Sequence, residues 1–216
     1  MGKHIRFTHE ACVETLEQAR TAVERGADRL ELCGDLSVGG ITPSDKLVKK
    51  VLRQCAVPVR IMVRPRGGNF VYSDAEFEQM LRTIDRLRRL GARQLVTGFL
   101  RADTHHIDTR RTQQFCERAA GLSVTFHKAI DETPDPVVSL LMLRWMTDVK
   151  HVLSSGGAPT AMEGAAVLAE MQDDCRRNGK ISLTVAGKVT PELIRPLYQR
   201  TGATEYHGRR VVGALP

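Results

Sequence analysis

The sequence predicts an α/β fold in which a single domain, residues 1–216, closes into a TIM-type (β/α)8 barrel. Short apolar or β-branched runs alternate with longer helical patterns, and the 216 residues allow eight units of about 27 residues each. The dipeptide Gly-Ala recurs at 26–27, 91–92 and 202–203, each time between the end of a helix and the next strand. No Gly-x-Gly-x-x-Gly opens the first helix, so a doubly wound open sheet ranks second and no nucleotide cofactor is indicated.

The first half of the chain supplies four of the strands. Ser44 is a residue type that caps helix N-termini, and Ser73 with Glu76 forms a capping box before a helix that runs to Gly91. Pro65 ends the third strand, because proline cannot donate to a sheet ladder. We therefore expect strands at residues 9–13, 29–33, 59–64 and 94–98, and helices at 16–25, from 44, at 73–91 and at 109–120.

The second half repeats this scheme up to the last strand. We expect strands at 123–127, 150–154, 182–186 and 204–207, and helices at 135–146, 160–175 and 191–199. Residues 208–216 are too few, and too marked by glycine and proline, for a full eighth helix. The eighth outer helix should therefore be missing or rudimentary. The resulting gap should expose apolar flanks of the first and last strands, a surface on which a homodimer can form.

Composition places the chain among ordinary globular proteins. It is 42% hydrophobic, 26% charged and 5% aromatic, and no stretch approaches the roughly 20 apolar residues that a membrane span needs. The first four residues, MGKH, do not begin an apolar leader. We therefore expect a cytoplasmic protein with no membrane partner.

The net charge of +7 raises the question of nucleic-acid binding. Four arginines of one amphipathic helix, at positions 82, 86, 89 and 93, share a face opposite apolar residues at 84, 87 and 90, which is typical of a solvated outer face. The 5% of aromatic residues are too few to stack bases. We expect no nucleic-acid partner and a preference for a small anionic ligand.

The cysteines indicate a reducing compartment. There are 5 of them, an odd number, widely spaced and without a Cys-x-x-Cys motif, so a disulfide framework is not expected. Cys55, Cys116 and Cys175 fall in or at the ends of helices, whereas Cys12 and Cys33 fall in strands.

Strand parity predicts a polar barrel interior. In the second and fifth strands one set of alternating residues is apolar (Leu30 and Leu32, Val124 and Phe126), as expected of a face covered by helices. The other set then points inward. A buried carboxylate needs a compensating charge, which Arg64 or a bound cation would provide. The inward residues are Glu10 and Cys12, Glu31 and Cys33, Met62 and Arg64, Thr125 and His127, and Glu205 and His207.

Several of these residues lie in longer recognisable segments. Residues 26–33 read GADRLELC, 39–44 GGITPS, 64–70 RPRGGNF and 124–131 VTFHKAID. With EACV at 10–13 and ATEYH at 203–207, they resemble the CutC family of cytoplasmic copper homeostasis proteins over nearly the whole chain. The resemblance implies a TIM-type barrel and a role in copper homeostasis, and Cu(I) binding has been attributed to some members.

Two positions depart from the family pattern. After the seventh strand the family has Ala-Gly-x-Gly-Val, whereas this chain has Ala186-Gly187-Lys188-Val189, which is one residue shorter and lacks the second glycine. Gly208 stands where the family commonly has serine. The shortened loop changes a segment that can contact a ligand.

The first functional hypothesis is Cu(I) binding at the barrel mouth. Thiolates are soft ligands that select Cu(I), and imidazole can add to them. Cys12 and Cys33 match the two strand cysteines of the family and have the same parity on adjacent strands, which lie about 4.8 Å apart. His127 or His207 would complete the site.

The alternative is a TIM-barrel enzyme acting on a small phosphorylated or carboxylated substrate, because barrel mouths are usual catalytic sites. Arginine forks and glycine-rich turns suit such anions, and a histidine beside a glutamate suits acid–base work. The candidate catalytic residues are Glu31, Arg64, His127, Glu205 and His207. The candidate ligand-binding residues are Arg64, Arg66, Gly67, Gly68, Ser155, Gly156, Gly187 and Lys188.

Overall fold

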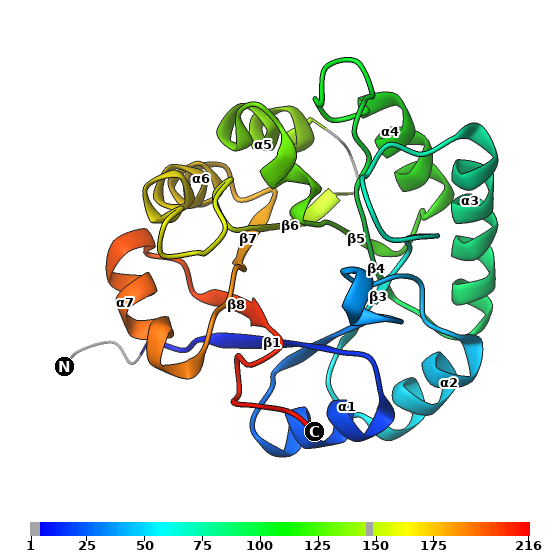
Figure 1. The fold of residues 1–216 in the computed structure, drawn as a ribbon, viewed down its shortest axis with the longest axis horizontal. Helices are drawn as coiled ribbons and strands as arrows, with labels where there is room; N and C mark the ends of the chain where they lie inside the picture. The colour runs from blue at the N-terminus through cyan, green and yellow to red at the C-terminus, as the bar shows by residue number, and fades with distance from the viewer. Residues whose placement is uncertain (1–4, 146–148) are drawn as a thin grey trace.

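The structure is a computed structural model that describes residues 5–145 and 149–216. Eight parallel strands form a closed barrel in sequence order, with helices around its outside (Figure 1), which confirms the predicted fold and excludes the open sheet. The strands are β1 (Thr8–Val13), β2 (Arg29–Leu32), β3 (Val59–Met62), β4 (Gln94–Thr97), β5 (Ser123–Phe126), β6 (Val149–Ser154), β7 (Ser182–Val185) and β8 (Glu205–Gly208).

Most helices begin where the sequence signals place them. The Ser44 hydroxyl accepts from Leu47 N–H, and the capping box of Ser73 and Glu76 is complete. Short 3₁₀ turns, η1 (Leu36–Val38) and η2 (Lys128–Glu132), follow β2 and β5. The helices are α1 (Leu16–Glu24), α2 (Asp45–Gln54), α3 (Asp74–Arg89), α4 (Thr109–Arg118), α5 (Pro136–Arg144), α6 (Ala165–Asn178) and α7 (Pro191–Thr201). Position 146 of the predicted helix 135–146 lies outside the described residues.

The start of α6 differs from the prediction. Thr160 accepts from Glu163 N–H, which is a local pattern that also opens helices, but residues 160–164 form a turn and the helix begins at Ala165. The turn is held against the end of β6, where a Cβ on Gly164 would lie 1.9 Å from Ser155 O. Tertiary contact with the β6 loop therefore delays the helix by five residues relative to the predicted start at 160.

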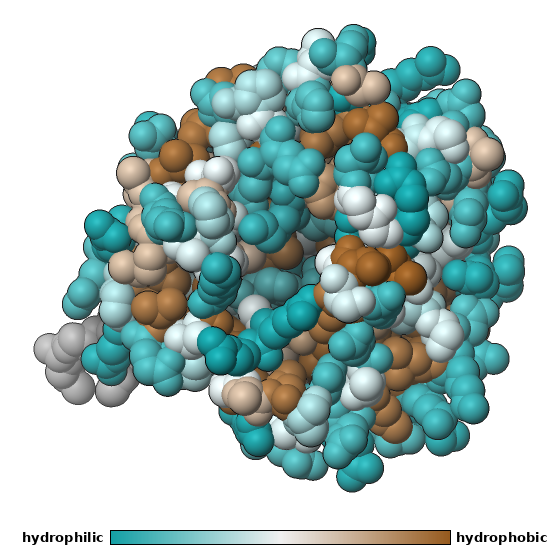
Figure 2. Space-filling model, viewed as in Figure 1, coloured by the Kyte–Doolittle hydropathy of each residue, from teal (hydrophilic) through white to brown (hydrophobic). Residues whose placement is uncertain are grey.

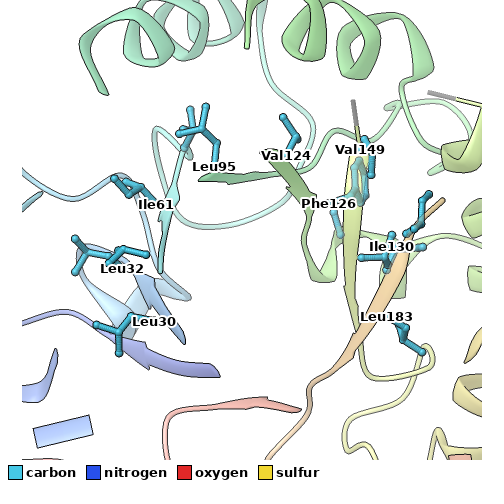
Figure 3. Packing of buried hydrophobic residues seen from close by; sticks show 14 of the residues in the cluster. Leu30, Leu32, Ile61, Leu95, Val124, Phe126, Ile130, Val149 and Leu183 are labelled. Atoms are coloured by element: carbon cyan, nitrogen blue, oxygen red, sulfur yellow. The ribbon is translucent and has the colours of Figure 1, made fainter. Parts of the chain in front are cut away.

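The two faces of the barrel wall are chemically different, as strand parity predicts. Outward side chains such as Leu30, Ile61 and Phe126 pack under the helices (Figure 3) and are fully buried. Inward side chains include Glu10 and Arg60, which are also fully buried. The polar interior therefore sits inside an otherwise ordinary apolar shell.

The side of the barrel after β8 is closed without a helix. In the described part of the chain no helix follows β8, and the C-terminal tail runs beside β1 to end at α1 (Figure 1). Gln18 Nε2 donates to Pro216 O at 2.9 Å. Ala11 and Tyr206 are 0% exposed, and Phe7 packs edge-on against the Tyr206 ring at 5.8 Å.

The missing eighth helix is thus confirmed, but the expectation of exposed flanks on β1 and β8 is wrong. The tail and the aromatic contacts of Phe7 cover those flanks. No helix among the described residues combines the length and the apolar character needed to cross a membrane.

Candidate functional site at the carboxyl end of the barrel

A cavity of about 500 Å³ opens at the carboxyl ends of the strands. Figure 2 looks onto this face and shows a hollow at its centre, with hydrophilic residues around much of the rim. Its volume falls in the range of small-molecule sites. Of the predicted site residues, Cys12, Glu31, Arg64, His127, Gly187, Lys188 and His207 line it.

Two thiols meet at one carboxylate oxygen beside this cavity. The Sγ atoms of Cys12 and Cys33 lie 3.4 and 3.6 Å from Glu31 Oε2. Register explains the meeting: Cys12 on β1 is paired with Glu31 on β2, and Cys33 follows Glu31 by two residues, so the three side chains point inward together. Cys12 is 7% and Cys33 1% exposed, so Cys12 is the sulfur nearer the opening.

The two thiols share their protons unequally. A hydrogen bond from Cys33 lowers the pKa of Cys12 well below its usual range, and the same bond raises the pKa of Cys33 well above it. Burial and the neighbouring Cys12 raise the pKa of Glu31 to about 8. Of the two thiols, Cys12 is therefore the one that loses its proton more readily.

His207 is the positive partner of the cluster around Cys12 and Glu31. Burial lowers the pKa of His207, but Glu31, Cys12 and Glu10 outweigh burial and raise it well above its usual range. Its Nδ1 lies 2.9 Å from Glu10 Oε1, and its Nε2 lies 3.7 Å from Glu31 Oε2. The His207 ring thus links the cluster of Cys12, Cys33 and Glu31 to the Glu10 carboxylate.

An ion cluster beneath the thiols supplies the compensating charge that the sequence assigned to Arg64 or a cation. Arg60 NH1 donates to Glu10 Oε2 at 2.8 Å, and Arg29 Nε donates to the same oxygen. Arg29 NH2 also pairs with Glu205 Oε2 at 2.7 Å. Arg60 and Arg29 were missed, although Arg60 has the same parity on β3 as Met62, which was placed inward.

Glu205 stands apart from the mouth. It opens β8, pairs in register with Thr8 at the start of β1, and contacts Arg29 and Thr184. The structure therefore places this predicted catalytic residue at the amino end of the barrel, where it completes the ion cluster and does not line the cavity.

His127 and Arg64 lie on another side of the cavity. Burial and Arg64 lower the pKa of His127 to about 3, so its ring is neutral. His127 Nδ1 accepts from Ala129 N–H at 3.2 Å, which leaves the proton on Nε2. Gly98 makes room for this ring, because a Cβ there would lie 2.5 Å from it. Arg64 NH1 donates to the carbonyls of Gly39 and Gly40, so much of its guanidinium is already used.

The predicted anion site at Arg66, Gly67 and Gly68 is not part of the cavity. Arg66 Nε pairs with Glu76 at 2.6 Å, and its other nitrogens donate to loop carbonyls. A Cβ on Gly67 would lie 2.8 Å from Val38. These residues shape a turn outside the cavity.

The loop after β6, which contains Ser155 and Gly156, satisfies its own donors. Asp131 accepts from the backbone N–H groups of Ser155 and Gly157 at 2.9 and 3.0 Å, and from the hydroxyl of Ser154. Gly156 N–H donates to Ser154 Oγ at 2.9 Å. An amide nest that could hold a phosphate is thus occupied by a carboxylate of the protein.

The shortened loop after β7 keeps its glycine-type geometry without a second glycine. Lys188 has φ +56°, a left-handed conformation that residues with a Cβ rarely adopt. Gly187 has φ +108°, and a Cβ there would lie 2.7 Å from Ala161 N. Lys188 is exposed and lines the cavity.

Potential metal ligands cluster in two groups among the described residues. One group is Cys12, Glu31 and Cys33, and the other is Glu10, Glu31 and His207, and in each group the ligand atoms lie within 4.8 Å of one another. Glu31 belongs to both. His127, a predicted ligand, belongs to neither.

Comparison with known proteins places the chain in a family. The model of the CutC family matches residues 7–212. A human copper homeostasis protein cutC homolog is 37% identical over 201 residues, covering 93% of this chain and 72% of that protein. A CutC family protein of Mesorhizobium japonicum is 41% identical over 199 residues, covering 92% and 75%.

Solved structures agree. The crystal structure of CutC from Streptococcus agalactiae has a TM-score of 0.88 and 32% identity, covering 95% of this chain and 99% of that one. A phosphoribosyl anthranilate isomerase from Thermococcus kodakaraensis, with a TM-score of 0.62 and 15% identity, shares the fold alone. Since the family model spans almost the whole chain and relatives exceed 30% identity over more than nine-tenths of it, this protein belongs to the CutC family.

Proposed function

We propose that the protein binds Cu(I) as cargo through Cys12 and Cys33 and so takes part in copper homeostasis. The observation that carries the proposal is the pair of sulfurs held at one carboxylate oxygen, 3.4 and 3.6 Å from Glu31 Oε2, with Cys12 facing a cavity. Two sulfur donors at a buried site suit Cu(I) better than they suit hard cations.

The backbone favours a metal-binding dithiol over a disulfide. Cys33 is a diagonal neighbour of Cys12, because the strand register pairs Cys12 with Glu31. Diagonal neighbours on adjacent strands have Cα atoms about 7–8 Å apart, beyond the usual span of a disulfide. The two sulfurs can therefore converge on an ion more readily than they can bond to each other.

Glu31 and His207 would complete the site. Glu31 Oε1 is buried and has no hydrogen-bond partner within the described residues, which fits an additional ligand or a proton carrier. His207 is the imidazole nearest to this group, whereas His127 lies outside both clusters. We therefore assign the supporting role to His207.

The names of the relatives support the copper role for this chain. The human and mouse relatives are copper homeostasis protein cutC homologs. All five cysteines are free thiols, which fits a reducing cytoplasm, and we propose that location.

A competition titration tests the proposal. Cu(I) is titrated against a chromophoric chelator with the native protein, Cys12→Ser, Cys33→Ser and the control Cys55→Ser, whose thiol lies at the end of α2. Replacing a residue that only hydrogen bonds to a metal ligand lowers metal affinity about 10–100-fold. Cys12→Ser and Cys33→Ser each remove a ligand itself, so each should lower Cu(I) affinity more than about 100-fold. Unchanged affinity in both strand variants would refute the proposal.

A second candidate function is an enzyme acting on a small anionic substrate, and the cavity favours it. Glu31, with a pKa of about 8, can donate a proton near neutral pH, and neutral His127 can hydrogen bond to a substrate. Cationic residues border the same cavity. A thermal-shift panel of phosphorylated and carboxylated metabolites on copper-free protein tests this function. A stabilising hit lost in His127→Ala would support it, and no hit would count against it.

A further inference from the structure

We infer that the cavity receives Cu(I) as a complex with a small anionic thiol, whose acidic groups lie against a cationic lip formed by Lys128, Lys188, Arg209 and Arg210. The inference rests on the proposed copper binding and adds the chemical class of the donor. Lys188 comes from the loop after β7, Arg209 and Arg210 follow β8, and Lys128 follows β5.

The cavity is larger than a single metal ion needs. Its volume of about 500 Å³ is that of a site for a small organic molecule. Cys12 and Glu31 in its lining, with the Cys33 sulfur behind them, already suffice for one ion. The space above Cys12 therefore fits an organic body that accompanies the metal.

The lining of the cavity carries more positive than negative groups. Among the described residues that line the cavity, Glu31 is the sole carboxyl group, against four cations of the lip and Arg64. Lys128 Nζ lies 3.5 Å from Asp131 Oδ2, and Arg209 donates to the carbonyl of Leu36. Lys188 is exposed and makes no ion pair within residues 5–145 and 149–216. A cleft lined by one sign of charge attracts ligands of the opposite sign and raises their rate of encounter.

The conformation of Lys188 points the same way. This lysine stands in a left-handed turn, at φ +56°, where glycine would be free of strain. Strained residues that persist at a cavity are often part of a site. Here the left-handed turn places a cation in the same cavity lining as the Phe70 and His127 rings, whose centroids lie 4.6 Å apart in a tilted arrangement.

Two donors remain for the body of the ligand. His127 Nε2 and Arg64 Nε are buried and have no partner in the part of the chain that the structure describes. Both residues line the cavity. A ligand that carries carboxylates and amides can accept hydrogen bonds from both donors, whereas a bare Cu(I) ion bound at Cys12 offers no acceptor to either of them.

The transfer that follows is a ligand exchange without redox change. A Cu(I) ion with two carrier thiolates exchanges them for Cys12 and Cys33: two Cu–S bonds to the carrier break and two to the protein form. Any proton on a protein thiol passes to a departing carrier sulfur, which then leaves as a thiol. A carrier sulfur that receives no proton leaves as thiolate, so charge and protons balance.

The test compares carriers with the same sulfur chemistry and different charge. Stopped-flow uptake of Cu(I) is measured from its complexes with glutathione, which is anionic, with 2-mercaptoethanol, which is neutral, and with cysteamine, which is cationic. The test variant combines Lys188→Asn with Arg210→Gln, and asparagine is chosen at position 188 because it tolerates the left-handed turn. The control is Lys50→Asn, on the exposed face of α2.

The double variant should slow uptake from glutathione about tenfold, with a weakened salt dependence, and should leave uptake from 2-mercaptoethanol within about twofold. Uptake by Lys50→Asn should equal that of the native protein. Equal slowing for all three carriers, or none, would overturn the inference. If Cys12→Ser and Cys33→Ser keep full Cu(I) affinity in the separate chelator titration, copper binding itself has failed instead.

Discussion

Replacing Glu10 with glutamine should destabilise the fold strongly, although the side chain keeps its size. Glu10 is 0% exposed and accepts from Arg60, Arg29 and the His207 ring. Glutamine removes the negative charge and leaves the fully buried Arg60 without a counter-ion. Removing one partner of a buried ion pair costs about 3–5 kcal/mol.

For a chain of this length, a loss of about 3–5 kcal/mol lowers Tm by about 6–20 °C, at about 2–4 °C for each kcal/mol.

The contribution of Glu10 to stability should weaken as the pH falls. Arg60, His207 and Arg29 outweigh burial and hold the pKa of Glu10 well below its ordinary 4.5, so its contribution is present above pH 4.5 and is lost in acid. The gap between native protein and Glu10→Gln should therefore narrow as the pH falls below that value.

Urea unfolding at pH 7 of native protein, Glu10→Gln, Arg60→Met and the double variant measures the effect. A buried apolar pair can replace a buried ion pair at little cost, so the double variant should lose much less than the two single losses added together. A loss below about 1 kcal/mol for Glu10→Gln, or additivity within about 0.5 kcal/mol, would show that Glu10 and Arg60 do not act as a buried ion pair.

Three further predictions concern single residues. Burial raises the pKa of Glu31 to about 8, so the protonated side chain stabilises the fold at acid pH and this contribution is lost as the pH rises toward 8. The free energy of unfolding of the native protein should therefore decline between about pH 5 and 8, and Glu31→Gln should make that decline smaller, as urea unfolding across this pH range would show. Asp131→Ala should abolish hydrogen-exchange protection of the Ser155 amide and cost about 1–3 kcal/mol, and retained protection would contradict this. Gly98→Ala should displace the His127 ring and cost about 1–3 kcal/mol, which a crystal structure and urea unfolding would check; an unmoved ring would contradict it.

The fold was predictable because its signals are local and repeated. Glycines at 26, 91 and 202 all take left-handed φ values at helix ends, as the Gly-Ala repeat predicts. Strand parity also placed Cys12, Cys33 and Glu31 inward together. Both signals act over a few residues, so they can be read from one sequence.

The rest of the site depends on contacts between distant segments. Asp131 accepts hydrogen bonds from the backbone amides of the β6 loop, although it lies 24 residues away from Ser155 in sequence. The sequence alone therefore suggested that the amides at Ser155 were available to bind a phosphate. Arg29 reaches Glu205 across 176 positions. Strand parity could have predicted that Arg60 points inward. Fully buried arginines are rare, however, and this one is stabilised by the Glu10 carboxylate, which comes from a distant part of the sequence.

X-ray absorption at the copper K-edge of the Cu(I)-loaded protein tests whether Cys12 and Cys33 hold the ion. We expect one Cu(I) per chain with two sulfur ligands, and the loss of one sulfur contribution in Cys12→Ser and in Cys33→Ser. A copper environment of nitrogen and oxygen alone, or a spectrum unchanged in both variants, would contradict it.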